Sequence, residues 1–169
     1  GGRGTWTRVL HDTGVSLFGS LAVNPANTSI MYAGDFAVAD PSLASTIIKS
    51  TNGGGTWAHT PQAPGLGDEI NAATLAINPA TPSTLYAGSN GTPNVAKSVD
   101  GASSWTSAQI TGGGSVKSLA INPVTTSTLY ASTRDKGVFK SVDGGGNWNA
   151  KNAGLAGVST TVRGGARFK

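Results

Sequence analysis

The 169-residue chain contains 25 glycines, and 12% of its residues are charged, about half of the ~25% that is typical of soluble domains. This composition excludes a coiled coil and a charge-rich disordered chain, and the lack of cysteine excludes disulfides and thiolate metal sites. The net charge of +4 comes from scattered basic residues, and no apolar run exceeds four residues, so we expect neither a specific nucleic-acid partner nor a transmembrane segment.

The sequence repeats one unit, which opens with Leu-Ala-(Val/Ile)-Asn-Pro and closes with a glycine-rich turn ending in tryptophan. Trp57, Trp105 and Trp148 follow one another at spacings of 48 and 43 residues, the period of a propeller blade. The full units are predicted over 17–61, 71–110 and 116–152, with residues 1–11 as the last strand of a preceding unit and 157–169 as the start of a further one.

Each unit is expected to form four short strands, because apolar and polar residues alternate between closely spaced turn signals. The Asn-Pro pair ends the first strand, since proline cannot donate a hydrogen bond to a neighbouring strand. The first strands are predicted at 18–23, 73–77 and 117–121, the second at 29–33, 83–87 and 127–131, the third at 47–50, 95–98 and 138–141, and the fourth from each tryptophan onward. The sequence therefore predicts an all-β fold.

The glycine-rich turns approximate the pattern Ser-x-Asp-x-Gly-x-x-Trp, carried by Ser50, Asn52, Gly54, Trp57, Ser98, Asp100, Trp105, Ser141, Asp143, Gly145 and Trp148. This pattern resembles the Asp-box, or BNR repeat, of sialidase-like propellers, sortilin-type receptors, xyloglucanases and photosystem II assembly factors. The resemblance implies a β-propeller. In such a turn the aspartate can accept hydrogen bonds from backbone N–H groups, glycine supplies positive φ, and tryptophan packs between sheets. Asn52 departs from the pattern, but its amide oxygen can still accept.

The predicted strands make about three and a half four-stranded blades, whereas closed propellers have about four to eight. The chain also begins at Gly1-Gly2-Arg3 without a methionine, which favours a processed or excised segment. We therefore expect a segment of a larger ring of about six to eight blades. The ring would be completed by more of the same chain or by a second copy.

Candidate binding residues lie in the segments that break the repeat. Asp35 and Asp40 belong to the long insertion 35–46, and Asn90 belongs to the shorter segment 89–94. Insertions between strands often carry function, so these residues are expected to lie on a loop binding face. The alternative interpretation is that Asp35 is simply a solvated loop acid.

The residues that catalysis would need are not arranged for it. Asp100 and Asp143 belong to the turns and are interpreted as structural, so no pair of carboxylates for glycoside hydrolysis stands out. His11 and His59 stand alone, and no phosphate-binding glycine motif follows a strand, so no metal or cofactor is expected.

Two further residue types recur once in each unit. The tyrosines are expected to pack between blades, and the lysines to cover the sheet with their stems while the ammonium reaches water; they are Tyr32, Tyr86, Tyr130, Lys49, Lys97 and Lys140. Arginines stand at non-equivalent positions, at Arg8, Arg134 and Arg163. Sialidase chemistry, which needs an arginine cluster and a tyrosine nucleophile, is therefore not expected.

The function predicted from these features is a non-catalytic, exported scaffold that binds a protein or glycan through its loops. Few charges, many small residues and no cysteine are typical of exported bacterial surface proteins, which predicts a secreted or cell-surface location, extracellular or periplasmic. Two alternatives share the fold: a fragment of a secreted polysaccharide hydrolase of the xyloglucanase type, and a subunit or assembly factor of a cell-surface or membrane-associated complex. If the protein is an enzyme, a glycoside hydrolase is expected.

Overall fold

The computed structural model describes residues 18–35, 47–66 and 72–155. Regular structure in these ranges is entirely β, and none of it is a helix that could span a membrane. The strands are β1 (Phe18–Val23), β2 (Met31–Asp35), β3 (Ile47–Ser50), β4 (Ala58–His59), β5 (Ala72–Ile77), β6 (Leu85–Ser89), β7 (Asn94–Ser98), β8 (Thr106–Gln109), β9 (Val116–Ile121), β10 (Leu129–Thr133), β11 (Gly137–Ser141) and β12 (Asn149–Ala150). The predicted strands at 1–11 and 157–169 lie outside the described residues.

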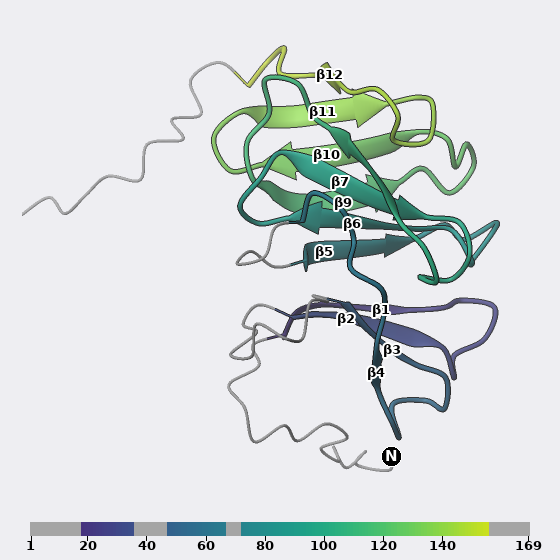
Figure 1. The fold of residues 1–169 in the computed structure, drawn as a ribbon. Coiled ribbons are helices and arrows are strands. Elements are labelled where there is room, and N and C mark those ends of the chain that lie inside the picture. The colour runs from purple at the N-terminus through teal and green to yellow at the C-terminus, as the bar shows by residue number, and fades with distance from the viewer. Residues whose placement is uncertain (1–17, 36–46, 67–71, 156–169) are drawn as a thin grey trace, which may run out of the picture.

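The described strands form three antiparallel four-stranded sheets, each a simple meander of consecutive strands (Figure 1). The first strands of successive sheets are neighbours, β1 beside β5 and β5 beside β9, and β2 and β6 also pack on the following sheet. The sheets therefore follow one another with their first strands innermost. This all-β arrangement is a partial β-propeller, as the sequence predicted.

The boundaries of the first and third strands agree with the sequence prediction to within one residue, but the second strands begin two residues later than predicted. The cause is the turn before them. Asn24 Oδ1 accepts hydrogen bonds from the backbone N–H groups of Ala26 at 2.9 Å and Asn27 at 3.2 Å, and Ile30 N donates to Asn27 O at 2.9 Å. The turn thus continues to residue 30 before pairing starts at Met31.

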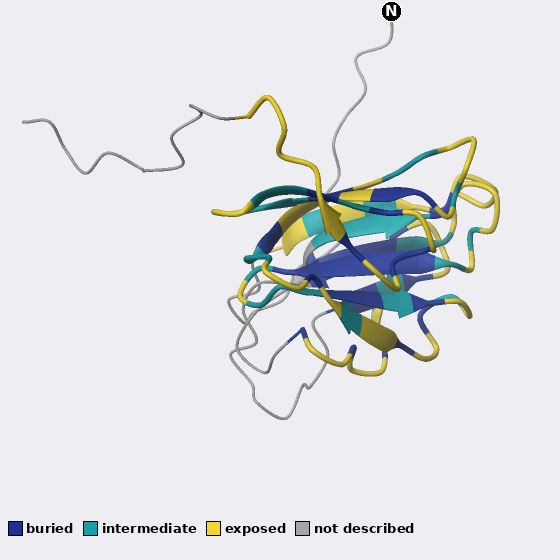
Figure 2. Cartoon of the chain, turned by 90° about the horizontal axis from the view of Figure 1, so that it is seen from above, coloured by how far each residue is buried: buried dark blue, intermediate teal, exposed yellow. Residues whose placement is uncertain are grey.

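The core consists of two apolar clusters, one between each pair of successive sheets. All five residues of β6 are buried, because this strand lies in the middle sheet and is covered from both sides (Figure 2). Each cluster combines the tyrosine of one sheet with the tryptophan of the next, Tyr32 with Trp105 and Tyr86 with Trp148. Burying a large side chain of this kind contributes roughly 1.5–3 kcal/mol, so the contacts between sheets hold the segment together.

Candidate functional site

Because consecutive strands are antiparallel, the connections between them lie alternately at two opposite ends of the segment. The regular end carries the turns that repeat in every unit, namely 24–30, 51–57, 78–84, 99–105, 122–128 and 142–148. The irregular end carries the connections that differ between units, of which 60–66, 90–93, 110–115 and 134–136 are described. The two ends offer different chemistry.

At the regular end, Ser141 and Asp143 organise one glycine-rich turn. Ser141 Oγ accepts a hydrogen bond from Gly145 N at 2.9 Å and donates to Asp143 Oδ1 at 2.7 Å. Asp143 Oδ1 also accepts from the backbone N–H groups of Gly146 and Asn147 at 3.0 and 2.9 Å, and Oδ2 accepts from Asn147 Nδ2 at 2.6 Å. Both carboxylate oxygens are therefore engaged within the turn itself.

The same pattern recurs at Asp100 and sets the protonation of both acids. Hydrogen bonds from the Ser104 side chain and backbone and from Ser98 lower the pKa of Asp100 from 3.8 to about 2. The backbone and side chain of Asn147, together with Ser141, lower the pKa of Asp143 further still. A general acid needs a pKa near the working pH, so neither carboxyl can serve as one at neutral pH.

Asn52 keeps the turn without the charge. Its Oδ1 accepts from Thr56 N at 2.8 Å, while its Nδ2 donates to Thr56 Oγ1 at 2.9 Å. The side-chain bond thus runs in the opposite direction from that at Asp143, because a hydroxyl can accept as well as donate.

The two acidic turns give the protein a predicted acid sensitivity that the Asn52 turn lacks. The folded-state pKa values of Asp100 and Asp143 lie below the unfolded value, so their stabilising effect is full above pH ~4 and disappears as the pH falls through the folded values. Thermal melts between pH ~6 and ~2 should show a flatter decline for the double variant Asp100→Asn, Asp143→Asn than for the wild type. The control Val124→Asn, at an exposed position without a titratable side chain, should leave the decline unchanged.

The tryptophan that ends each turn distinguishes the middle unit. Trp148 Nε1 donates to Gly145 O at 3.1 Å, whereas Trp105 Nε1 is buried without a hydrogen-bond partner among the described residues. The residue equivalent to Gly145 in that unit is Ala102, which adopts φ of 71° where Gly145 has 89°. Because an L-residue is restricted in this region, Ala102 does not reach the glycine geometry, and the indole bond is not made.

The ammonium groups of Lys49 and Lys97 bond to the following sheet, so for these two residues the expectation that the ammonium reaches water is wrong. Lys49 Nζ donates to Gly101 O of the following sheet at 2.8 Å, and Tyr32 Oη reaches the same oxygen at 3.3 Å. Lys97 Nζ donates likewise to Gly144 O at 3.0 Å. Each ammonium also lies over the tyrosine ring of its own sheet, at 5.5 to 5.6 Å from the centroid. This Tyr–Lys pair fastens the first sheet to a turn of the middle sheet, and the middle sheet to a turn of the third.

At the irregular end, the structure describes the side chain of only one of the three predicted binding residues, Asn90. Asp35 is the last residue of β2, and its side chain is not described. Asp40 lies outside the described residues. Asn90 is half-buried, and its Oδ1 accepts a hydrogen bond from Lys117 Nζ of the next sheet. Lys117 could not be predicted as a partner of Asn90, because no sequence motif links these two positions.

The segment around Asn90 is held firmly by its neighbours. Thr92 Oγ1 and Asn94 Nδ2 both donate to Gly65 O at 2.8 Å, and Ser89 Oγ donates to Leu66 O at 3.3 Å. These bonds tie the connection after β6 to the chain that joins the first two sheets. These hydrogen bonds therefore hold the backbone on both sides of Asn90 in place.

Residues with catalytic or metal-binding chemistry do not gather in the described ranges. No group of three His, Cys, Asp or Glu side chains there could hold a metal ion. His59 is exposed in β4, and His11 lies outside the described residues, as do Asp12, Asp68 and Glu69.

Solved structures with a similar fold are propellers of different function. The chain matches an ancestral GH74 enzyme with a TM-score of 0.62 and 23% identity, over 80% of this chain and 19% of that one. It matches the GH74 enzyme of Niastella koreensis with 0.61 and 24%, over 79% and 22%, and YCF48 bound to a D1 peptide with 0.61 and 14%, over 81% and 41%. The chain thus spans about a fifth of each GH74 enzyme's length.

No protein-family model matches the sequence, and comparison with curated proteins gives no match either. The likeness at these identities establishes the β-propeller fold and nothing finer.

Proposed function

We propose that the chain is a segment of an exported, non-catalytic β-propeller scaffold that binds a protein or glycan through its irregular end. The supporting observation is the contrast between the two ends. The carboxylates of Asp100 and Asp143 at the regular end are engaged within their own turns, whereas the irregular end exposes Lys117, which bonds to Asn90, together with Arg134 and Lys136. The ligand we expect is a segment rich in carboxylate or hydroxyl groups.

In this proposal the glycine-rich turns are Asp-boxes with a structural role. The hydrogen bonds of Ser141 and Asp143 support that role, because they close the turn on itself. We propose the units at 17–61, 71–110 and 116–152 as blades; the strands predicted at 1–11 and 157–169 lie outside the described residues. The exported location, at the cell surface or outside it, rests on composition.

The propeller structures support a binding role by analogy. YCF48 was solved with a D1 peptide bound, so a similar fold presents a peptide site in that protein. For this chain we propose the same kind of binding, in which a ligand segment in an extended conformation lies across the irregular end. A role as a subunit or assembly factor of a surface or membrane-associated complex is one form of this proposal.

Binding is tested with a displayed peptide library and a glycan array, followed by affinity measurements on each hit. The double variant Asn90→Ala, Lys117→Ala should weaken these ligands by about tenfold or more, or about 1.4 kcal/mol. Val124→Ser, at an exposed position of the regular end, is the control and should leave affinity unchanged. If Val124→Ser weakens binding while the variant Asn90→Ala, Lys117→Ala does not, the binding site lies at the regular end and the proposal is wrong.

A second candidate is a fragment of a secreted polysaccharide hydrolase of the xyloglucanase type, favoured by the two GH74 enzymes among the similar structures. Its general acid would be neither Asp100 nor Asp143, since hydrogen bonds within their turns lower the pKa of both carboxyls. Release of reducing sugar from xyloglucan by the chain would favour this candidate. A scaffold should release none.

A further inference from the structure

The two contacts between successive sheets follow one design, and each has a fixed direction. The β2–β3 or β6–β7 face provides a tyrosine and a lysine, and the following sheet provides a turn carbonyl and a tryptophan. A side chain built on Gly101 or Gly144 would lie within 3.6 Å of the incoming lysine and tyrosine. Every contact therefore joins two unlike surfaces, a Tyr–Lys face and a turn face.

The third sheet carries a Tyr–Lys face that no described residue covers. Tyr130 is 39% exposed, whereas Tyr32 and Tyr86 at the equivalent positions are 2% exposed. Lys140 nevertheless lies over the Tyr130 ring at 5.6 Å from its centroid, the same distance as in the preceding pair. The face is thus preformed in the geometry that the other two use for docking.

The first sheet carries the complementary turn face, also uncovered by described residues. No described atom lies within 4 Å of the site where a side chain on Gly53 would begin, the position equivalent to Gly101 and Gly144. Leu21 is 61% exposed, while Leu119 at the same position of the third sheet is 8% exposed.

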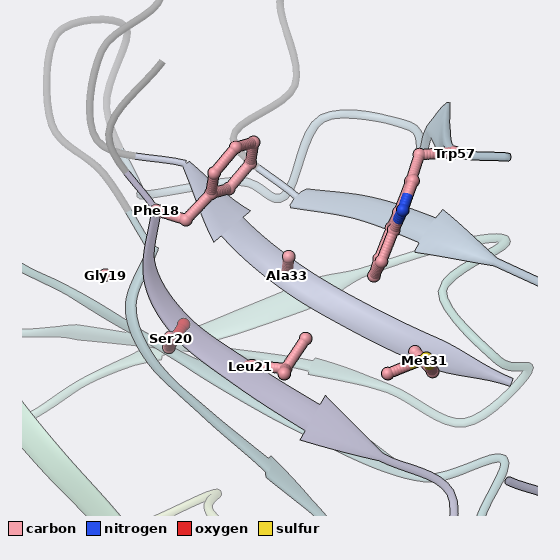
Figure 3. Close-up of a pocket in the computed structure, with 7 residues that line it drawn as sticks. All are labelled: Phe18, Gly19, Ser20, Leu21, Met31, Ala33 and Trp57. Atoms are coloured by element: carbon pink, nitrogen blue, oxygen red, sulfur yellow. The ribbon is translucent and has the colours of Figure 1, made fainter. Parts of the chain in front are cut away.

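A hollow of about 410 Å³ opens beside Trp57 on this face, with Phe18, Leu21 and Met31 directed into it (Figure 3). In the third sheet the corresponding tryptophan, Trp148, packs against Tyr86 of the sheet before it. The shape and chemistry that fill this position inside the chain are therefore those of a Tyr–Lys face.

We propose that these two surfaces are halves of one interface, and that the Tyr–Lys face of one copy docks head to tail on the turn face of a second copy. Lys140 donates to Gly53 O of the other copy, and Tyr130 fills the hollow beside Trp57. Two copies together contain twice the three four-stranded sheets of one chain. That number of sheets lies within the range of about four to eight blades found in closed propellers. The same contact made twice closes the ring.

One edge of this contact differs from the contacts inside the chain. Ser132 stands where the middle sheet has Gly88, against which Val116 of the next sheet packs closely. The incoming residue at that point is Phe18, which is larger than Val116. The inner strands of the two copies are therefore farther apart at this edge than β5 and β9.

The test is the mass of the full chain in solution by sedimentation velocity, at concentrations from about 1 to 100 μM, where interfaces of moderate affinity are half-formed. We expect a species of twice the 16.8 kDa chain mass. Leu21→Glu, which removes the turn face, and the double variant Tyr130→Ala, Lys140→Ala, which removes the Tyr–Lys face, should each raise the dissociation constant by about tenfold or more. Val124→Glu adds the same charge at a 90% exposed position in the turn 122–128 and should associate like the wild type.

Mixing the two defective variants gives the decisive result. Each variant alone lacks one half of the interface. The variant Tyr130→Ala, Lys140→Ala keeps an intact turn face, and Leu21→Glu keeps an intact Tyr–Lys face that can dock on it. The mixture should therefore form dimers that neither variant forms alone. Circular dichroism and thermal melts confirm that each variant is folded. A wild type that stays monomeric overturns the proposal, as does a dimer that survives both variants or a mixture that fails to associate.

Discussion

Replacing Tyr86 by alanine should lower the free energy of unfolding by about 3–5 kcal/mol, the cost of removing a large buried aromatic side chain. Tyr86 is 2% exposed and packs between the middle and third sheets, and this burial raises its pKa above 10.0. Its removal also leaves Lys97 without the ring that positions its ammonium. Urea unfolding of the wild type and the variant, followed by tryptophan fluorescence, measures the difference.

Tyr130→Ala is the matched control, because Tyr130 occupies the same register position opposite a lysine in the third sheet. The exposed ring of Tyr130 buries less area than that of Tyr86. In solution too dilute for copies to associate, Tyr130→Ala should therefore lower the free energy of unfolding by less than about half as much as Tyr86→Ala. Equal costs for the two substitutions would mean that contact with the next sheet does not stabilise the segment.

Replacing Gly145 by alanine should cost about 2–5 kcal/mol, through two effects that add. An L-residue at φ of 89° carries about 1–2 kcal/mol of strain, and loss of the bond from Trp148 Nε1 to Gly145 O leaves a buried donor unpaired, worth about 1–3 kcal/mol. The new methyl group would also lie 3.2 Å from Tyr86 Cε1. Denaturant unfolding measures the loss of stability, and the indole N–H resonance of Trp148 in NMR spectra reports the bond.

The reverse substitution, Ala102→Gly, provides the comparison. It should allow the middle turn to reach the glycine geometry and give Trp105 Nε1 the backbone acceptor that it lacks. We expect the Trp105 indole resonance to move toward that of Trp148. If Gly145→Ala leaves the Trp148 resonance in place, the residue at this position does not control the indole bond.

The repeat predicts the number and order of the strands, because the same motifs recur at the period of one blade. It does not predict where the second strands begin, because Asn24, like Asn78 and Asn122, uses its side chain to hold a turn that continues past the proline. Side-chain bonds to nearby backbone compete with strand pairing. Only the structure shows which prevails at residues 29 and 30.

The Tyr–Lys pair could have been found from the sequence, whereas the Asn90–Lys117 contact could not. Tyr32 pairs with Lys49 across β2 and β3, and this register follows once the two strands are aligned by their turn. Asn90 and Lys117 belong to different sheets and to segments without a repeated motif. Their proximity depends on how neighbouring sheets pack, which a motif does not encode.

The complete burial of β6 has a consequence for the way the segment comes apart. Releasing the first or the third sheet breaks one apolar cluster, whereas releasing the middle sheet breaks both. In arrays where each unit contacts only its neighbours, stability is a sum over such junctions. Unravelling therefore starts from the outer sheets and reaches β6 last, and any added neighbour that caps an outer sheet protects the whole array by removing a point at which fraying begins.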